Sequence, residues 1–218
     1  MKYSVHAACL LLAGIALSSC NKHIYVPNMV NAPLLKERYE FKGAITPTNL
    51  QGAFAVTDNI AIMANGQYVY GFNYKDTDPD NNNNNDDFLV DDNTRGGVIE
   101  GAVGFFKPLD RRQRMVFDVY AGYGGGSFKT ISSNYSPDNG GNKSDYVLRN
   151  HFSKVFIQPS IGFVHPVIEA AFPDHFSLVN FYNSTMGPRD FENGANGRET
   201  LLHINGKPVP FYNPALTF

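Results

Sequence analysis

The stretch Gln113-Arg-Met-Val-Phe-Asp-Val-Tyr-Ala-Gly-Tyr-Gly-Gly-Gly-Ser-Phe128 decides the fold class of this chain. Large apolar residues recur at alternate positions on one face, namely Met115, Phe117, Val119 and Tyr123. The opposite face carries polar or small residues, namely Arg114, Asp118 and Gly122. A period of two residues predicts a β-strand with one apolar and one polar face.

The same alternation continues along most of the chain, and no stretch shows helical periodicity. We therefore expect an all-β protein with eight strands, at residues 37–46, 49–57, 60–72, 95–107, 113–128, 148–163, 167–181 and 208–218. The polar faces carry acidic residues (Glu100, Asp118, Glu169) and basic residues (Arg38, Lys42, Arg114, Lys154). We expect these side chains to point inward and to neutralise one another in a narrow lumen.

The connections between these strands alternate in length. Those at 57–59, 107–112 and 164–166 are short, whereas those at 73–94, 129–147 and 182–207 are long and polar. Only the turn around Pro47 departs from this rule. In an antiparallel meander, alternate connections lie at opposite ends, so short turns at one end face long loops at the other. This asymmetry predicts an eight-stranded antiparallel up-and-down β-barrel of the outer-membrane type.

Aromatic residues also fit a membrane boundary. Tyr68, Tyr70 and Phe72 lie at the long-loop end of the third strand, where an interfacial girdle is expected. The alternative is a soluble barrel or sandwich with the apolar face inward. Alternation by itself does not separate the two, but the loop asymmetry favours the membrane.

The N-terminus has the form of a signal peptide. Met1-Lys2 supplies one positive charge, and an apolar run over 7–17, too short to span a bilayer, ends at Leu17-Ser18-Ser19-Cys20. This ending resembles a bacterial lipobox, which implies cleavage before Cys20 and acylation of its thiol. The predicted organisation is a signal peptide at 1–19, a lipidated extended tether at 20–36 and a β-barrel domain at 37–218. An ordinary secretory signal that contains a cysteine remains the alternative.

Composition narrows the possible activities. The chain has 18 basic and 20 acidic residues, so no basic excess points to nucleic acid. Cys9 lies in the signal and Cys20 is the predicted acylation site, which leaves no cysteine for a disulfide, zinc cluster or nucleophile. The remaining histidines, His23, His151, His165, His175 and His203, show no metal-ligand spacing.

Two further stretches resemble ligand-binding motifs only superficially. Gly122–Gly126 lacks the helix that follows a phosphate-binding loop, and its glycines are better suited to strand curvature. Asp76–Asp80 alternates carboxylates but lacks the central glycine and bidentate glutamate of an EF-hand. We therefore predict no catalytic, cofactor-binding or metal-binding residues.

The chain from 27 to 218 resembles the small outer-membrane β-barrel lipoproteins of Bacteroidetes. The resemblance rests on Tyr25-Val-Pro-Asn28, the stretch 51–66, Phe156-Ile-Gln-Pro-Ser-Ile-Gly162 and Asn213-Pro-Ala-Leu-Thr-Phe218. It implies fold and location rather than activity. It also implies a domain that continues past Phe218, so a C-terminal truncation is expected. Pro159 and Pro173 each remove a ladder donor in mid-strand, which counts against a closed barrel unless the bulges expected there absorb them.

These observations favour a lipid-anchored, non-enzymatic outer-membrane β-barrel with a structural, adhesion or envelope role and with membrane lipid as its partner. The alternative is a periplasm-facing soluble-barrel lipoprotein that binds an apolar small ligand. A barrel enzyme acting on lipid is a third possibility. No acidic cluster follows Cys20, which favours the periplasmic leaflet for the anchor. The ligand or partner of the long loops stays open.

Overall fold

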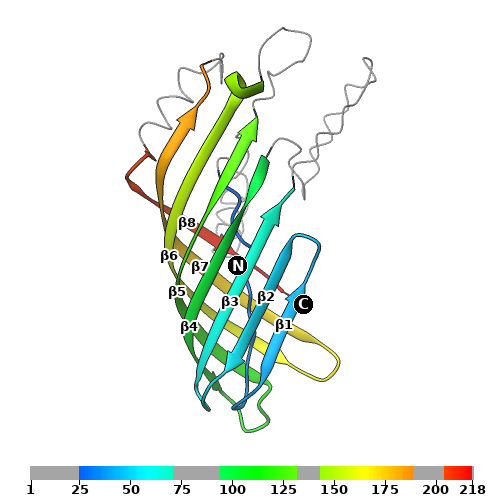
Figure 1. Ribbon diagram of the computed structural model, residues 1–218. Helices are drawn as coiled ribbons and strands as arrows, with labels where there is room; N and C mark the ends of the chain where they lie inside the picture. The colour runs from blue at the N-terminus through cyan, green and yellow to red at the C-terminus, as the bar shows by residue number, and fades with distance from the viewer. Residues whose placement is uncertain (1–24, 71–93, 132–142, 189–203, 218) are drawn as a thin grey trace, which may run out of the picture.

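The computed structural model describes residues 25–70, 94–131, 143–188 and 204–217. They form one antiparallel sheet in which each strand pairs with its neighbours along the chain (Figure 1). The strands are β1 (Phe41–Ile45), β2 (Asn49–Ala55), β3 (Ile60–Val69), β4 (Thr94–Pro108), β5 (Met115–Ile131), β6 (Val147–Val164), β7 (Glu169–Met186) and β8 (Pro208–Pro214). A short 3-10 helix, η2 (Lys143–Tyr146), precedes β6. The eight predicted strands and their up-and-down order are confirmed.

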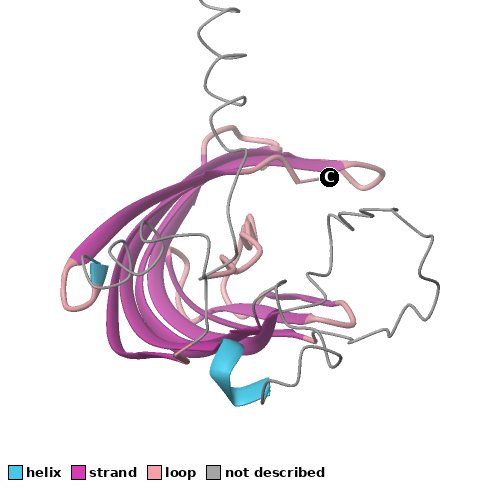
Figure 2. Ribbon diagram, turned by 90° about the horizontal axis from the view of Figure 1, so that it is seen from above, coloured by secondary structure: helices cyan, strands magenta, loops and turns pink. Residues whose placement is uncertain are grey.

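The sheet curls around a concave face, as the view from above shows (Figure 2). The predicted closure into a barrel is wrong for this chain. Among the described residues, β1 pairs with β2 alone and β8 with β7 alone, so the first and last strands leave a seam. Within the same residues, no helix has the length and apolar character needed to cross a membrane.

Prolines explain why β8 makes a poor closing strand. The backbone N–H of Ala215, just past β8, donates to the carbonyl of Pro173 in β7. Because N–H groups alternate in direction along a strand, odd-numbered positions face β7 and even-numbered positions face the seam. Three of the even-numbered positions are prolines without an N–H group: Pro208, Pro210 and Pro214. This edge therefore offers few donors to another strand.

The β1 edge of the seam differs from the β8 edge. Thr46 and Asn49 exchange both of their backbone hydrogen bonds, so even-numbered positions of β1 face β2. The N–H and C=O groups of the odd-numbered positions then face the seam, at Phe41, Gly43 and Ile45. None of these is a proline, so β1 retains a full set of donors and acceptors along its open edge.

The two faces of the strands are divided as the alternation predicts. On β4, Ile99 is 76% exposed and its neighbour Glu100 only 3%. The same contrast holds on β6, where Ile157 is exposed while Gln158 and Lys154 are buried. The apolar face is thus convex and exposed, and the polar face is concave and buried.

The concave face also holds large aromatic side chains that the sequence analysis did not place there. Those that are almost fully buried are Phe106, Tyr120, Phe128, Phe152 and Phe181. Each aromatic ring buries a large apolar area, so these residues dominate the core. The core is therefore a mixture of aromatic packing and a few buried charges rather than a network of charges among small residues.

The short β2–β3, β4–β5 and β6–β7 connections lie at one end of the sheet, as predicted, and the short β1–β2 turn around Pro47 lies at the other. Between β4 and β5, the carboxylate of Asp110 accepts backbone N–H groups of Met115 at 2.8 Å, Arg114 at 2.7 Å and Arg112 at 3.2 Å. These donors, Met115 foremost, hold the pKa of the Asp110 carboxyl below its ordinary value. The Asp110 carboxylate therefore stabilises the turn between β4 and β5 by accepting three backbone hydrogen bonds.

The expected bulges at Pro159 and Pro173 are not found. Ile157 pairs with Phe176 and Ser160 with Pro173, so the β6–β7 register is the same on both sides of the prolines. The ladder is interrupted between these pairs rather than shifted, because proline has no N–H to donate. The register shift between β6 and β7 lies at Arg149 and His151 instead.

Candidate functional site

Residues 25–36, called the inner segment here, are the main feature of the concave face. They form no regular secondary structure, yet Leu34 and Leu35 are completely buried and Tyr25 nearly so. An extended tether was expected over 20–36, and the described part of that stretch is packed against the sheet. Cys20, the predicted acylation site, lies outside the described residues.

The N-terminal end of the inner segment is fixed by aromatic packing. The Tyr25 ring meets Phe152 edge-on, with centroids 4.9 Å apart, and contacts Phe211 at 5.1 Å. It also lies edge-on to Phe128 and Phe181, at 6.1 and 6.2 Å. Edge-to-face pairs of this kind contribute about 0.5–1.5 kcal/mol beyond area burial. Tyr25 is therefore an aromatic anchor at the level of β6 residue 152.

A buried ion pair lies beneath this anchor. Lys154 forms a salt bridge with Glu100, and their side chains are 1% and 2% exposed. The Lys154 Nζ also donates to the Tyr25 hydroxyl at 3.1 Å. Because a charge of this burial is costly without a partner, the pair holds β4, β6 and the inner segment in one arrangement.

The middle of the inner segment is held by amide side chains of the sheet. Gln51 Nε2 donates to the Met29 carbonyl at 2.8 Å, and the Met29 N–H donates to Gln67 Oε1 at 3.1 Å. Gln158 Nε2 donates to the Asn31 carbonyl at 2.5 Å. The segment thus satisfies backbone groups through side chains where a β-strand would use a ladder.

The C-terminal end of the inner segment is held by two further charged groups. The Leu34 N–H donates to Asp118 at 3.3 Å, and the Ser160 hydroxyl donates to the same carboxylate. Lys42 Nζ donates to the Leu34 carbonyl at 3.2 Å and forms a salt bridge with Glu169 at 2.9 Å. Both sides of the Leu34 backbone are therefore fixed.

A glycine makes room for the Leu34 side chain. A Cβ placed on Gly162 of β6 would overlap with the Leu34 methyl groups. Gly162 therefore allows close approach of the inner segment to the sheet. The residue belongs to the stretch Phe156–Gly162 on which the family resemblance partly rests.

The predicted inward charges are confirmed in part. The structure brings Glu100 together with Lys154, and Glu169 with Lys42. The Asp118 side chain points to the concave face, where its carboxylate accepts hydrogen bonds from two neutral donors. The prediction is wrong for Arg114 and Arg38, which are exposed, and the Arg38 guanidinium lies 4.6 Å from the Tyr39 ring centroid. Both arginines lie outside regular strands, where the two-residue period does not apply.

The other sequence-predicted positions add no catalytic grouping. His175 is buried, with Nδ1 3.1 Å from Gln158 Oε1 and its ring stacked on Phe156. No group of three metal-ligating side chains is found among the described residues. Gly122–Gly126 lies within β5, as expected of curvature-permitting glycines. Asp76–Asp80 falls outside the part of the chain that the structure describes.

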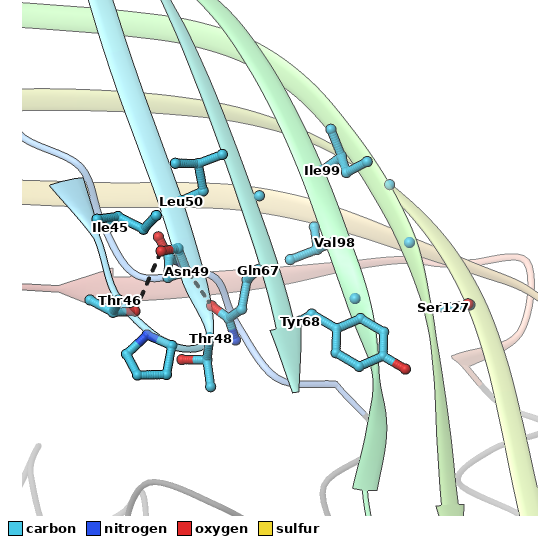
Figure 3. A pocket seen from close by; sticks show the side chains of 15 residues that line it. Ile45, Thr46, Thr48, Asn49, Leu50, Gln67, Tyr68, Val98, Ile99 and Ser127 are labelled. Atoms are coloured by element: carbon cyan, nitrogen blue, oxygen red, sulfur yellow. Dashed lines mark hydrogen bonds between the residues drawn. The ribbon is translucent and has the colours of Figure 1, made fainter. Parts of the chain in front are cut away.

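A groove of about 570 Å³ lies where β2, β3 and β4 approach the long-loop end (Figure 3). Its walls include the exposed side chains of Leu50, Tyr68 and Ile99. Gly66 and Gly125 flank Ile99 on the neighbouring strands and supply no side chain. The groove carries no charged side chain, so it offers apolar contact rather than chemistry.

The arrangement as a whole is a curled sheet that binds its own N-terminal segment. No protein-family model matches the chain, and no curated protein or solved structure matches it.

Proposed function

We propose that this chain is a lipid-anchored protein of a bacterial outer membrane, embedded through its curled sheet, with a structural, adhesion or envelope role and no enzymatic activity. The observation that carries the proposal is the orientation of the two faces. The exposed side chains in the middle of the convex face are mostly apolar, whereas Glu100, Asp118 and Lys154 are buried on the concave face. Such a molecule has its lipophilic surface outside.

The extent of the apolar band supports this proposal. On the outward positions of β4, apolar or small residues run from Gly97 to Phe105, and the exposed Arg95 and Lys107 bound them. A tilted strand needs about 9–11 residues to cross a bilayer. The apolar band on β4 has this length, and the charged residues Arg95 and Lys107 at its ends would lie at the two membrane–water interfaces.

Aromatic residues mark the long-loop boundary. Tyr68 and Tyr70 are exposed at the end of β3, with ring centroids 4.6 Å apart, and Tyr182 is exposed on β7. Tyrosines at this level match the girdle of membrane barrels. Phe72, the third expected member, lies outside the described residues. Asp174 interrupts the convex face, and its carboxylate accepts the Tyr212 hydroxyl at 2.7 Å.

The soluble alternative required the opposite orientation, with the apolar face inward. Its ligand would need the concave interior, which the inner segment fills with Tyr25, Leu34 and Leu35. Both observations weigh against an apolar small ligand in the interior. The same packing favours a filled lumen over a diffusion pore.

Embedding in a bilayer places a requirement on the seam. Backbone donors and acceptors in hydrocarbon need partners, and an open sheet edge is not tolerated there. Among the described residues, no strand pairs with the seam-facing groups of Phe41, Gly43 and Ile45, so these groups must meet another strand in the membrane. The proposal includes this completion of the sheet at β1.

The test compares two neighbouring positions on β6. Protein without the signal and carrying Cys20→Ser is refolded into bilayers with either Ile157→Cys or Gln158→Cys, each labelled with a fluorophore. Lipids carrying spin labels on their acyl chains should quench the label at 157 strongly and the label at 158 weakly. Equal and weak quenching at both positions would refute the embedding of the sheet in the membrane and favour the soluble alternative.

A further inference from the structure

The path of the inner segment fixes the side of the sheet from which the N-terminus departs. Tyr25 packs against Phe152 near the start of β6, and Leu34 packs at Gly162 near its end. The chain therefore runs along the concave face from the long-loop end to the short-turn end. Only then does it enter β1.

Tyr25 lies level with the aromatic boundary described above. Phe152 pairs with Phe181, and the preceding residue His151 pairs with Tyr182. Tyr182 is one of the exposed tyrosines at the long-loop end. The anchor ring inside the sheet and the girdle outside it thus share one level.

The reach of the preceding chain decides which interface Cys20 can meet. Five residues, from 20 to 25, extend at most about 18 Å. From Phe152 to Val164 at the short-turn end, β6 covers about 40 Å along the strand. At a strand tilt of about 40°, as in barrel strands, this is about 30 Å along the membrane normal. Cys20 therefore reaches the long-loop interface and falls short of the other.

We propose that the N-terminal acyl anchor inserts into the leaflet on the long-loop side, and that the inner segment carries the chain back through the sheet. This inference rests on the proposed function, because it needs both the lipidated Cys20 and the embedded sheet. It reverses the periplasmic leaflet that the sequence after Cys20 favoured. The lipid partner and the long loops then share one face of the membrane.

The arrangement has a mechanical consequence for the anchor. Force applied to the acyl chains would act on the packing of the Tyr25 ring and on the hydrogen bonds that the carbonyls of Met29, Asn31 and Leu34 accept from the sheet. The anchor and the sheet are therefore joined through a packed segment.

The test uses full-length protein in the outer membrane of intact cells, with one reactive thiol at a time. Lys22→Cys reports the chain beside the anchor, Ser136→Cys reports a long loop, and Asp58→Cys reports a short turn. A membrane-impermeant maleimide is applied before and after permeabilisation of the outer membrane, and denatured samples give the total thiol. Labelled palmitate is followed in the same strains, with Cys20→Ser as its control.

We expect Lys22→Cys to label under the same condition, and to the same extent, as Ser136→Cys, with Asp58→Cys labelled under the other. Labelling of Lys22→Cys together with Asp58→Cys, while palmitate is incorporated, would overturn this inference alone. Reaction of Lys22→Cys only after denaturation would also overturn it. Absence of palmitate from the wild-type chain would instead overturn the proposed lipid anchor, and this inference with it.

Discussion

The buried pair Glu100–Lys154 is the most sensitive single point of this structure. Both side chains are at most 2% exposed, and Lys154 also donates to Tyr25. Replacement by Lys154→Met keeps most of the side-chain volume but leaves the Glu100 carboxylate buried without its cation. Breaking a buried pair in this way costs about 3–5 kcal/mol.

The double variant Glu100→Met, Lys154→Met removes both charges and leaves an apolar contact of similar volume. Replacing a buried pair by packed apolar side chains is often neutral or stabilising. Loss of the donor to the Tyr25 hydroxyl offsets this by about 1 kcal/mol. We therefore expect the double variant to recover most of the stability that the single variant loses.

The measurement is urea unfolding of the refolded protein in bilayers. The chain contains no tryptophan, so circular dichroism of the sheet is the suitable signal. With a slope of about 1–3 kcal/mol per M urea, a loss of about 3–5 kcal/mol should lower the midpoint of Lys154→Met by about 1–5 M. The exposed Lys107→Met makes the same chemical change without burial and should leave the midpoint within about 0.5 M. A double variant as unstable as the sum of both single variants would refute this account of the pair.

Three further outcomes follow from other parts of the molecule. Cys20→Ser should abolish incorporation of labelled palmitate, and continued incorporation would exclude Cys20 as the acylation site. Asp110→Asn should lower the free energy of unfolding at neutral pH. The difference in free energy of unfolding between this variant and wild type should vanish as the pH falls through the lowered pKa of Asp110, below about 4. A difference that persists in acid would contradict the role of the Asp110 carboxylate in stabilising the turn. In bilayers the Gly43 amide should exchange slowly with solvent, because another strand must cover the seam there; fast exchange would show that the β1 edge is not embedded.

The strands and their faces were predictable from the sequence because a strand has a simple period. Val155, Ile157 and Ile161 alternate with Lys154 and Gln158, and the structure exposes the first set and buries the second. The period fails where the backbone leaves the strand. Arg38 and Arg114 precede β1 and β5, so their side chains follow the turns and reach solvent.

Closure was not predictable from alternation, because it depends on which backbone groups point to the edge. The prolines of β8 were visible in the sequence, but their meaning depends on register. Once Ala215 is seen to donate to β7, Pro208, Pro210 and Pro214 all fall on the seam side. The same three residues on the β7 side would have broken the pairing instead.

The inner segment was the least predictable part, because its contacts are distant in sequence and follow no period. One signal was present: Leu34 and Leu35 are adjacent apolar residues in a stretch expected to be an extended tether. In a tether free in solution, both apolar side chains would be exposed to water, whereas in the structure both are completely buried.

The inner segment and the curled sheet are best understood as one unit. An eight-stranded barrel is narrow enough for its own side chains to fill it, whereas an open curl of the same strands leaves the interior wider. The structure fills that interior with aromatic rings and with a length of its own chain, whose backbone is satisfied by Gln51, Gln67 and Gln158. The buried charges then have a specific task, because Lys154 and Lys42 each meet both a carboxylate of the sheet and an oxygen of the inner segment. Removal of the inner segment would take away one oxygen partner from each of Lys42 and Lys154. The segment is therefore part of the core of the protein rather than a tether attached to it.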